Sequence, residues 1–411
     1  MNPSWLLPSL RRAAARPPLA ARLLLPMLAR LRGGLLDLTL PDGRRECFGS
    51  GDGPVARLVV HDWRVFGRVL AAGDIGFADA FIAGEWQSSE PATLLRLLLA
   101  NRGVLDAAIH GRGPAKLLHG LRALAQRNTR RGSERNIHAH YDIGNAFYRE
   151  WLDETMSYSS AWFDGDLTRS LADAQRLKMR RALAECGIAP GGRLLEIGCG
   201  WGALAELAAR ETGAEVTGIT LSRQQLAWGR ERIADAGLAQ RCRLQYADYR
   251  DLPALAEGRP FDAVISIEMF EAVGAAYWRS YFDVLRRSLK PGGRACIQTI
   301  TMHEALYDRY VRSTDFIQQT IFPGGRLPSA SVFRAEAERA GFEVERTLHF
   351  GADYAETLRR WRERFLARSA VLPALGLDQR FERTWHYYLA TCEAAFAVGD
   401  TDVVQFTLRR A

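Results

Sequence analysis

The chain has few of the features that would settle its class at once. No apolar run of about 18 residues is free of charges, so a membrane-spanning helix is not expected. The six cysteines are far apart and form no C-x-x-C pair. That spacing argues against a disulfide framework or a zinc cluster and suits a reducing cytosol. Lysine is scarce, since only Lys116, Lys178 and Lys290 occur among 55 basic residues.

Apolar side chains and arginine are abundant. The apolar fraction of 47% excludes a mainly disordered chain, and the length of 411 residues predicts two or three domains. The net charge of +8 comes almost wholly from arginine, which stays protonated and binds phosphate bidentately. Such a charge suits nucleic acid or an anionic lipid surface and does not decide between them.

The order of segments predicts four parts. Residues 1–33 form a basic N-terminal segment, either an amphipathic piece resting on anionic lipid headgroups or a solvated tail. Residues 34–100 form a small α/β accessory domain. Residues 101–136 form a basic linker with a leucine stripe, which could dock on a membrane or only connect two domains. Residues 137–411 form the catalytic domain.

A glycine turn opens the catalytic part. A short apolar strand, 193–198, runs into Gly198, Gly200 and Gly202 and then into a helical stretch, 203–211. Strand, glycine turn and helix together place backbone N–H groups and a helix N-terminus around an anionic group. The spacing is G-x-G-x-G and lacks the sixth-place glycine of the dinucleotide fingerprint.

Two features beside the turn bear on the ligand. Glu196 lies within the strand, where a charge needs a partner such as an amino group of a ligand. The next strand ends in Thr220 and not in the acid that a nicotinamide ribose prefers. Ser222 and Gln225 follow with capping-box spacing, which a purely structural role also explains.

The remaining strands define the fold class. The third strand ends in Asp248 and Tyr249, which offer an acceptor and a ring to an adenine. Strands at 261–268, 292–301 and 402–410 continue the alternation of strand and helix. The sequence therefore predicts a doubly wound α/β sheet with its ligand at the carboxyl ends of the strands.

Seven segments of the catalytic part occur in the order of a known family. They are 140–145, 156–160, 194–202, 270–274, 321–325, 350–354 and 402–406. The chain resembles class I, Rossmann-like S-adenosylmethionine-dependent methyltransferases. More specifically, it is similar to cyclopropane-fatty-acyl-phospholipid synthases and mycolic-acid cyclopropane synthases. The resemblance spans residues 136–411 and is looser over 34–100.

The resemblance implies methyl transfer from S-adenosylmethionine to a cis double bond of an unsaturated phospholipid acyl chain, through a carbocation. Proton loss from the transferred methyl group closes a cyclopropane, which is the first expectation. Proton loss from a neighbouring carbon leaves an alkene. The alternative product of the same methyl transfer is a methylene- or methyl-branched chain. Tyr141, Tyr158 and Ser159 would close over the methionine part of the cofactor. In addition to Tyr141, the residues expected to bind the cofactor are Tyr158, Ser159, Glu196, Gly198, Gly200, Gly202, Thr220, Ser222, Gln225, Asp248 and Tyr249.

The family also implies a second ligand. In cyclopropane synthases a bicarbonate ion is thought to accept the proton. The positions that match its cage are Ser160, Glu271, Gln298, Ile300 and Tyr354. Ser160 replaces a usual cysteine and Gln298 a usual histidine. Both side chains can donate to an anion, so the resemblance leaves bicarbonate binding open.

An additional carboxylate suggests different chemistry. Glu268 stands where glycine is usual, and close to Glu271 it would repel an anion. In the alternative hypothesis, Glu268 or Glu271 stabilises the carbocation or takes the proton directly. The surrounding segments look most like the branch that makes tuberculostearic acid. A strand-end carboxylate held by a backbone N–H explains Glu268 nearly as well.

The other expectations concern partners and place. A nucleic-acid methyltransferase is a remote alternative, because residues 268–271 carry acids where such enzymes have an Asn/Asp-Pro-Pro motif. The histidines show no metal-ligand spacing, so no metal is expected. The expected enzyme is cytoplasmic and docks on the inner membrane surface, where it meets unsaturated phospholipid chains and no nucleic acid. A homodimer and a flavin reductase partner are left open.

Overall fold

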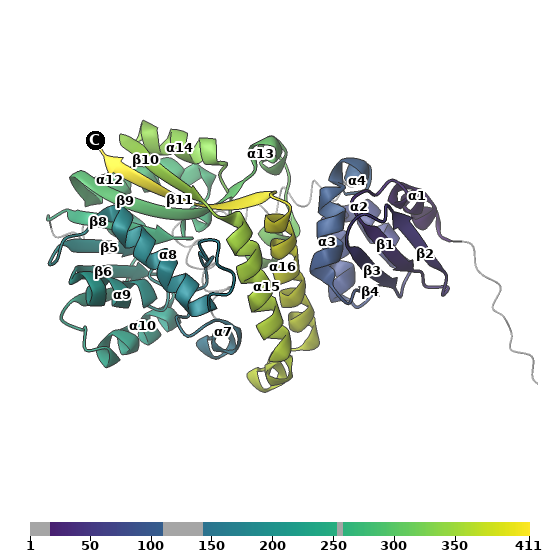
Figure 1. Cartoon of the computed structure of the whole chain (residues 1–411), viewed down its shortest axis with the longest axis horizontal. Coiled ribbons are helices and arrows are strands. Elements are labelled where there is room, and N and C mark those ends of the chain that lie inside the picture. The colour runs from purple at the N-terminus through teal and green to yellow at the C-terminus, as the bar shows by residue number, and fades with distance from the viewer. Residues whose placement is uncertain (1–16, 110–142, 253–257) are drawn as a thin grey trace, which may run out of the picture. The chain divides into compact units, whose positions relative to one another are not determined.

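The computed structural model describes residues 17–109, 143–252 and 258–411 (Figure 1). The chain divides into two compact units, 1–113 and 114–411. Three expectations lie outside the described residues: the lipid contact of residues 1–16, the basic linker at 110–136 and the contact of Tyr141 with the cofactor.

The first unit contains a four-stranded sheet in the order β2-β1-β3-β4. β1 and β3 are parallel, and the other neighbours are antiparallel. Leu36 and Leu38 on β1 are buried, with half-buried residues between them, which is the two-residue period of a strand with one covered face. The elements are α1 (Leu19–Leu28), β1 (Leu35–Thr39), β2 (Arg45–Gly49), β3 (Val55–Val60), α2 (Arg64–Ile82), β4 (Trp86–Gln87), α3 (Pro91–Ala100) and α4 (Arg102–Ile109).

Helix α1 is part of this unit, whereas the sequence analysis placed it in a separate segment. Ala21, Leu24 and Leu31 are buried, and the N–H of Arg32 donates to Asn101 Oδ1 at 2.8 Å. The apolar side of α1 lies against α2 and α4. The accessory unit therefore begins before residue 34.

The second unit contains a seven-stranded sheet in the order β10-β11-β9-β8-β5-β6-β7. The neighbours from β9 to β7 are parallel, while β11 is antiparallel to both β9 and β10. The strands are β5 (Arg193–Ile197), β6 (Glu215–Thr220), β7 (Cys242–Tyr246), β8 (Phe261–Ile267), β9 (Leu289–Met302), β10 (Phe342–His349) and β11 (Thr401–Arg410). The expected Rossmann-like α/β fold is confirmed.

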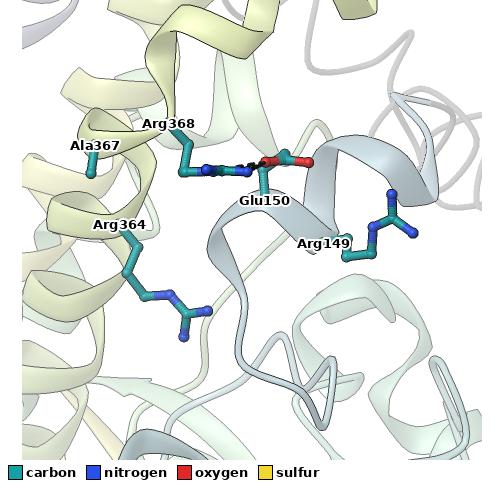
Figure 2. A pocket seen from close by; sticks show the side chains of 5 residues that line it. All are labelled: Arg149, Glu150, Arg364, Ala367 and Arg368. Carbon is teal, nitrogen blue, oxygen red and sulfur yellow. Dashed lines mark hydrogen bonds and ion pairs between the residues drawn. The ribbon is translucent and has the colours of Figure 1, made fainter.

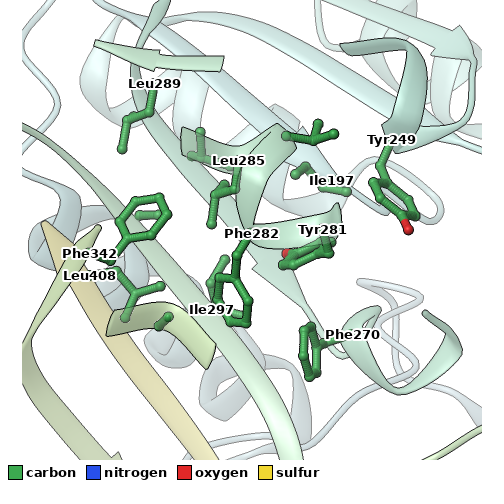
Figure 3. Close-up of a cluster of buried hydrophobic side chains, with 14 of the residues drawn as sticks. Ile197, Tyr249, Phe270, Tyr281, Phe282, Leu285, Leu289, Ile297, Phe342 and Leu408 are labelled. Atoms are coloured by element: carbon green, nitrogen blue, oxygen red, sulfur yellow. The ribbon is translucent and has the colours of Figure 1, made fainter. Parts of the chain in front are cut away.

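Helices cover both faces of this sheet. Leu195 and Ile197 of β5 belong to one buried cluster, which includes side chains of α12 and α14 (Figure 3). Leu194 belongs to a second cluster with α8, α9 and α10. Successive residues of a strand point to opposite faces, so one strand supplies both cores. The longer helices are α7 (Asn145–Trp151), α8 (Leu171–Cys186), α9 (Ala203–Thr212), α10 (Arg223–Asp235), α12 (Trp278–Ser288), α13 (Glu304–Tyr310), α14 (Ala330–Arg339), α15 (Gly351–Ala367) and α16 (Gln379–Ala397).

One strand of the sheet was not expected. β10 has the sequence FEVERTLH, with charged residues at three of its eight positions. It lies at the edge of the sheet and pairs on one side only, with β11. An edge strand does not need a continuous apolar run, so hydrophobic patterning alone did not reveal it.

Candidate active site

The glycine turn follows β5 as expected. Gly198, Gly200 and Gly202 have φ values of 84°, 49° and 83°, in the region that favours glycine. A Cβ at Gly198 would lie 3.1 Å from Met269 Cβ, and one at Gly202 would lie 3.2 Å from Gly229 Cα. The turn therefore requires glycine and delivers the backbone to the N-terminus of α9.

Glu196 is buried in β5, directly before this turn. Burial raises its pKa well above the usual value, and the nearby backbone of Ala205 opposes that rise only in part. Its Oε2 is buried and has no hydrogen-bond partner among the described residues. An orphaned carboxyl oxygen beside a glycine turn fits a ligand that carries N–H or O–H donors.

Thr220, Ser222 and Gln225 bind one another. The N–H of Ser222 donates to Thr220 Oγ1 at 3.1 Å, and Ser222 Oγ accepts the N–H of Gln225 at 3.3 Å. Thr220 Oγ1 donates to Gln225 Oε1 at 3.0 Å. This is the cap of α10 that the spacing indicated, and contact of these three residues with a cofactor stays a prediction.

Asp248 and Tyr249 follow β7. Asp248 accepts the N–H of Arg250 at 2.9 Å and forms an ion pair with its guanidinium at 3.3 Å. The ring of Tyr249 packs edge-on against Tyr281, 5.5 Å between centroids, in the cluster of Figure 3. Their predicted contact with an adenine is likewise untested.

Tyr158 and Ser159 lie in the segment between α7 and α8. The hydroxyl of Tyr158 is 2.7 Å from that of Tyr388, and its ring lies near those of Trp151 and Trp361. Ser159 Oγ accepts from Lys178 Nζ at 2.6 Å. These contacts place the segment against α15, α16 and α8.

Glu268 is the centre of the predicted catalytic group. It follows β8 with a φ of 49°, an uncommon value for a residue other than glycine. Its Oε1 accepts the N–H of Ser160 at 2.8 Å and Gln298 Nε2 at 2.7 Å. Its Oε2 accepts the hydroxyl of Tyr354 at 2.6 Å. Three of the five groups expected to hold bicarbonate therefore hold the carboxylate of Glu268.

Glu271 has different partners. Its Oε1 accepts the N–H of Ile300 at 2.5 Å and the hydroxyl of Thr299 at 3.0 Å. Its Oε2 is buried without a partner among the described residues. Burial, and then the charge of Glu268, raises the pKa of Glu271 to about 8. Glu271 and Ile300, the other two positions expected to hold bicarbonate, are therefore hydrogen-bonded to each other.

A directed chain of hydrogen bonds fixes the side chain of Gln298. Arg181 donates to Gln405 Oε1 at 2.5 Å, Gln405 Nε2 donates to Gln298 Oε1 at 2.9 Å, and Gln298 Nε2 donates to Glu268. A guanidinium only donates and an ionised carboxylate only accepts. Arg181 at one end of this series of hydrogen bonds and Glu268 at the other therefore fix the orientation of the amide groups of Gln405 and Gln298. Each amide NH2 group donates in the direction of Glu268.

Aromatic rings surround this group. Tyr354 lies 4.4 Å from Phe396 and 6.1 Å from Trp361, centroid to centroid. All three are buried, as is Tyr388. These rings form an apolar wall beside the carboxylates, and the ring faces can stabilise a positive charge.

The pocket of about 510 Å³ in Figure 2 lies elsewhere on the catalytic unit. Arg149 and Glu150 of α7 line it together with Arg364, Ala367 and Arg368. Arg368 forms an ion pair with Glu150 at 2.8 Å. None of the predicted site residues lines this pocket, and in the described parts of the chain no cluster of metal-ligating side chains occurs.

The sequence matches the family described as mycolic acid cyclopropane synthetase over residues 128–406. The chain belongs to this family. It is an S-adenosylmethionine-dependent methyltransferase that methylates or cyclopropanates lipid acyl chains. The resemblance stated from the sequence is confirmed.

Two curated relatives show the range of the family. Over 415 residues, the chain is 38% identical to tuberculostearic acid methyltransferase UfaA1 of Mycobacterium tuberculosis, covering 97% of this chain and 92% of the relative. Over 350 residues it is 34% identical to the cyclopropane-fatty-acyl-phospholipid synthase of Escherichia coli, covering 84% and 85%.

Two solved structures match the catalytic part. The cyclopropane synthase MmaA2 of Mycobacterium tuberculosis is 30% identical, with a TM-score of 0.62 over 67% of this chain and 98% of that chain. Mycolic acid cyclopropane synthase CmaA1, solved with S-adenosylhomocysteine and CTAB, is 32% identical, with a TM-score of 0.61 over the same shares.

Four polar residues near the site escaped the sequence analysis, namely Gln175, Lys178, Arg181 and Gln405. Gln175 and Lys178 are buried on α8 beside Ala174 and Ala182. A helical wheel of residues 171–186 places both on the apolar stripe, a signal that could have found them. No comparable signal exists for Gln405, because only the sheet register brings it opposite Gln298.

Proposed function

We propose that this enzyme methylates the cis double bond of unsaturated phospholipid acyl chains and that Glu268 is the built-in anion that faces the resulting carbocation. The observation that carries the proposal is the set of three donors on the Glu268 carboxylate. A carboxylate with both oxygens bonded stays in place without reorganisation as charge develops nearby.

The proposed cofactor site is the glycine turn with the side chains that the sequence analysis assigned to it. Glu196 would accept from a donor of the cofactor, because its Oε2 is buried and has no partner among the described residues. When bound, S-adenosylmethionine supplies an electrophilic methyl group. An alkene is a poor nucleophile, so the protein must align it with that methyl group in a water-free site.

Bicarbonate does not fit this arrangement. Ser160, Gln298 and Tyr354 already donate to Glu268, and a second anion beside that carboxylate would be repelled. We infer that Glu271 accepts the proton, because its Oε2 has no partner among the described residues and its pKa of about 8 suits a base that works near neutral pH. The methyl carbon bonds to one alkene carbon and leaves the cation on the other, and a hydride shift then moves the cation to the methylated carbon. A C–H bond of the new methyl group breaks, its electron pair forms the C=C bond of a methylene group, and the proton passes to Oε2.

For the product we favour the methylene-branched chain, the alternative of the sequence analysis, over the cyclopropane. In the ring-forming members, the resemblance assigns proton removal from the transferred methyl group to bicarbonate. Here a side-chain base in another position would take the proton only after a hydride shift has moved the cation to the methylated carbon. The electron pair left on the methyl carbon then forms a double bond and not a ring. The identity of 38% with a tuberculostearic acid methyltransferase over 97% of the chain supports this choice.

The test uses the full chain, S-adenosylmethionine and vesicles that contain oleoyl phosphatidylglycerol. Mass spectrometry should show one added CH2 unit on the acyl chain, and NMR should show vinylidene signals. Cyclopropane ring protons would refute the branched product and leave the methyl transfer intact. No methylated lipid of any kind would refute the proposed function.

We also propose that helix α1 docks on an anionic membrane surface. Leu19 and Leu23 lie one turn apart and are 68% and 55% exposed, with Arg22 also exposed between them. Exposed leucine next to arginine is the composition of an interfacial helix. Among the described residues, no helix is long and apolar enough to span a bilayer. A homodimer and a flavin reductase partner stay predictions.

A further inference from the structure

Lys178 is a buried cation that the chemistry above does not use. It lies on α8 with 1% of its surface exposed. Its Nζ donates to Ser159 Oγ at 2.6 Å and to Gln175 Oε1 at 2.5 Å, both neutral acceptors. Among the described residues, no carboxylate lies within ion-pair distance of it. A buried ammonium group without a direct counter-ion is costly, so a purely structural role explains it poorly.

The contacts of Lys178 lead to Glu268 in two steps. Lys178 holds the side chain of Ser159, and Gln175 Nε2 donates to the backbone oxygen of the same serine at 2.8 Å. The next residue, Ser160, donates its N–H to Glu268. Two side chains of α8 therefore fix the segment that supplies one of the three donors to the carboxylate.

The charges of Lys178 and Glu268 also act on each other. All three direct partners of Glu268 are neutral groups, on Ser160, Gln298 and Tyr354. Burial raises the pKa of Glu268, and the charge of Lys178 opposes that rise. Burial lowers the pKa of Lys178 to about 8, and the charge of Glu268 opposes that fall.

We propose that Lys178 is a positioning residue for the methyl transfer, which holds the Ser159–Ser160 segment against Glu268 and supplies the positive charge that the direct partners of Glu268 lack. The proposal rests on the proposed function, because Glu268 must act as an anion. It assigns Lys178 no contact with the substrate.

The proposal predicts a particular dependence on pH. Turnover should rise as Glu271 ionises and fall as Lys178 loses its proton, both near pH 8. A narrow bell-shaped profile follows. The other titratable groups that act on these two residues are Glu268, whose charge reaches both, Asp153 near Lys178 and Tyr281 near Glu271.

The experiment compares K178M and K178R with the wild type on oleoyl phospholipid vesicles. K178M should lower kcat by about tenfold or more, the effect of one lost electrostatic contact, while KM for the lipid stays within about threefold. K178R keeps the charge without titrating, so it should retain more activity and move the falling limb to higher pH. Melting temperatures show whether each variant is folded.

The outcomes separate the two proposals. An inactive wild type refutes the proposed function. An active wild type with unchanged kcat in K178M refutes the role of Lys178 alone. If K178M does not fold, the profile of K178R decides, and a falling limb at the wild-type position refutes the role of Lys178.

Discussion

Glu268 and Glu271 are three residues apart, yet the fold gives them different environments. Both oxygens of Glu268 are bonded, whereas Glu271 keeps one buried oxygen without a partner among the described residues. The sequence showed two neighbouring carboxylates but could not rank them. Which of the two carboxylates is held by donors depends on the backbone of Glu268, whose φ is 49°. This value is uncommon for residues other than glycine, so the residue types alone do not predict it.

Replacing Glu268 by glycine should convert the site to one that depends on an external anion. Glycine adopts the observed φ without strain, and the donors on Ser160, Gln298 and Tyr354 become free. We expect E268G to lose about 100-fold or more in turnover without bicarbonate, by the usual magnitude for a lost catalytic group. Added bicarbonate should restore part of it and yield cyclopropane, measured by NMR of the lipid. Chloride at equal ionic strength is the control, and rescue by chloride would contradict the prediction.

Replacing Glu271 by glutamine should abolish turnover and spare cofactor binding. The amide oxygen can still accept from Ile300 and Thr299, but glutamine cannot take a proton. We expect a loss of about 100-fold or more in kcat, with S-adenosylhomocysteine affinity within about threefold by calorimetry. E211Q, at an exposed ion pair with Arg180 on the surface, is the control. Near-normal turnover in E271Q would show that the base lies elsewhere.

E271Q should also change how the free energy of unfolding depends on pH. The pKa of Glu271 is raised from 4.5 to about 8, so the native state holds a proton that the unfolded chain releases above pH 4.5. The wild type should therefore lose stability between pH 4.5 and about 8 relative to E271Q. Urea unfolding at several pH values measures the difference, and parallel curves would contradict the raised pKa.

Single helices and strands were the features that the sequence predicted best. The apolar runs of β5, β6 and β8 lie within one or two residues of their expected positions, because buried parallel strands are continuous apolar segments. The edge strand β10 and the packing of α1 were missed, since both depend on tertiary neighbours. The contacts of Gln405 with Gln298 depend on the register of β11 against β9.

The cap of α10 offers a test between a structural and a binding role. Ser222 caps α10 through the N–H of Gln225, and Ser170 caps α8 through the N–H of Asp173 at 3.1 Å. Each serine-to-alanine change should cost about 1 kcal/mol of stability. If Ser222 also contacts the cofactor, S222A alone should weaken S-adenosylhomocysteine binding by about tenfold, as one lost hydrogen bond does. Equal affinities of S222A and S170A for S-adenosylhomocysteine would show that Ser222 only caps the helix.

At the scale of the whole molecule, the enzyme must bring a soluble cofactor and a lipid to one site. The double change L19E/L23E should lower sedimentation with vesicles of phosphatidylglycerol by about tenfold, since it removes apolar surface and adds negative charge. L167E, at a leucine 56% exposed on the catalytic unit, is the control. Binding should also fall as salt rises. Unchanged sedimentation of L19E/L23E would place the membrane contact outside α1.

The position of β11 has a consequence for how this protein is made. β11 pairs with β9 and β10 at once, and its residues Val403, Val404 and Phe406 are buried. It comes later in the chain than the other six strands of its sheet, so it is synthesised after both of its partner strands. Until it is synthesised, both partner strands expose open hydrogen-bonding edges, and Gln298 has no amide to orient it. The catalytic centre is therefore complete only after β11 has been synthesised and has paired, and a chain truncated before Thr401 should be inactive and prone to aggregation.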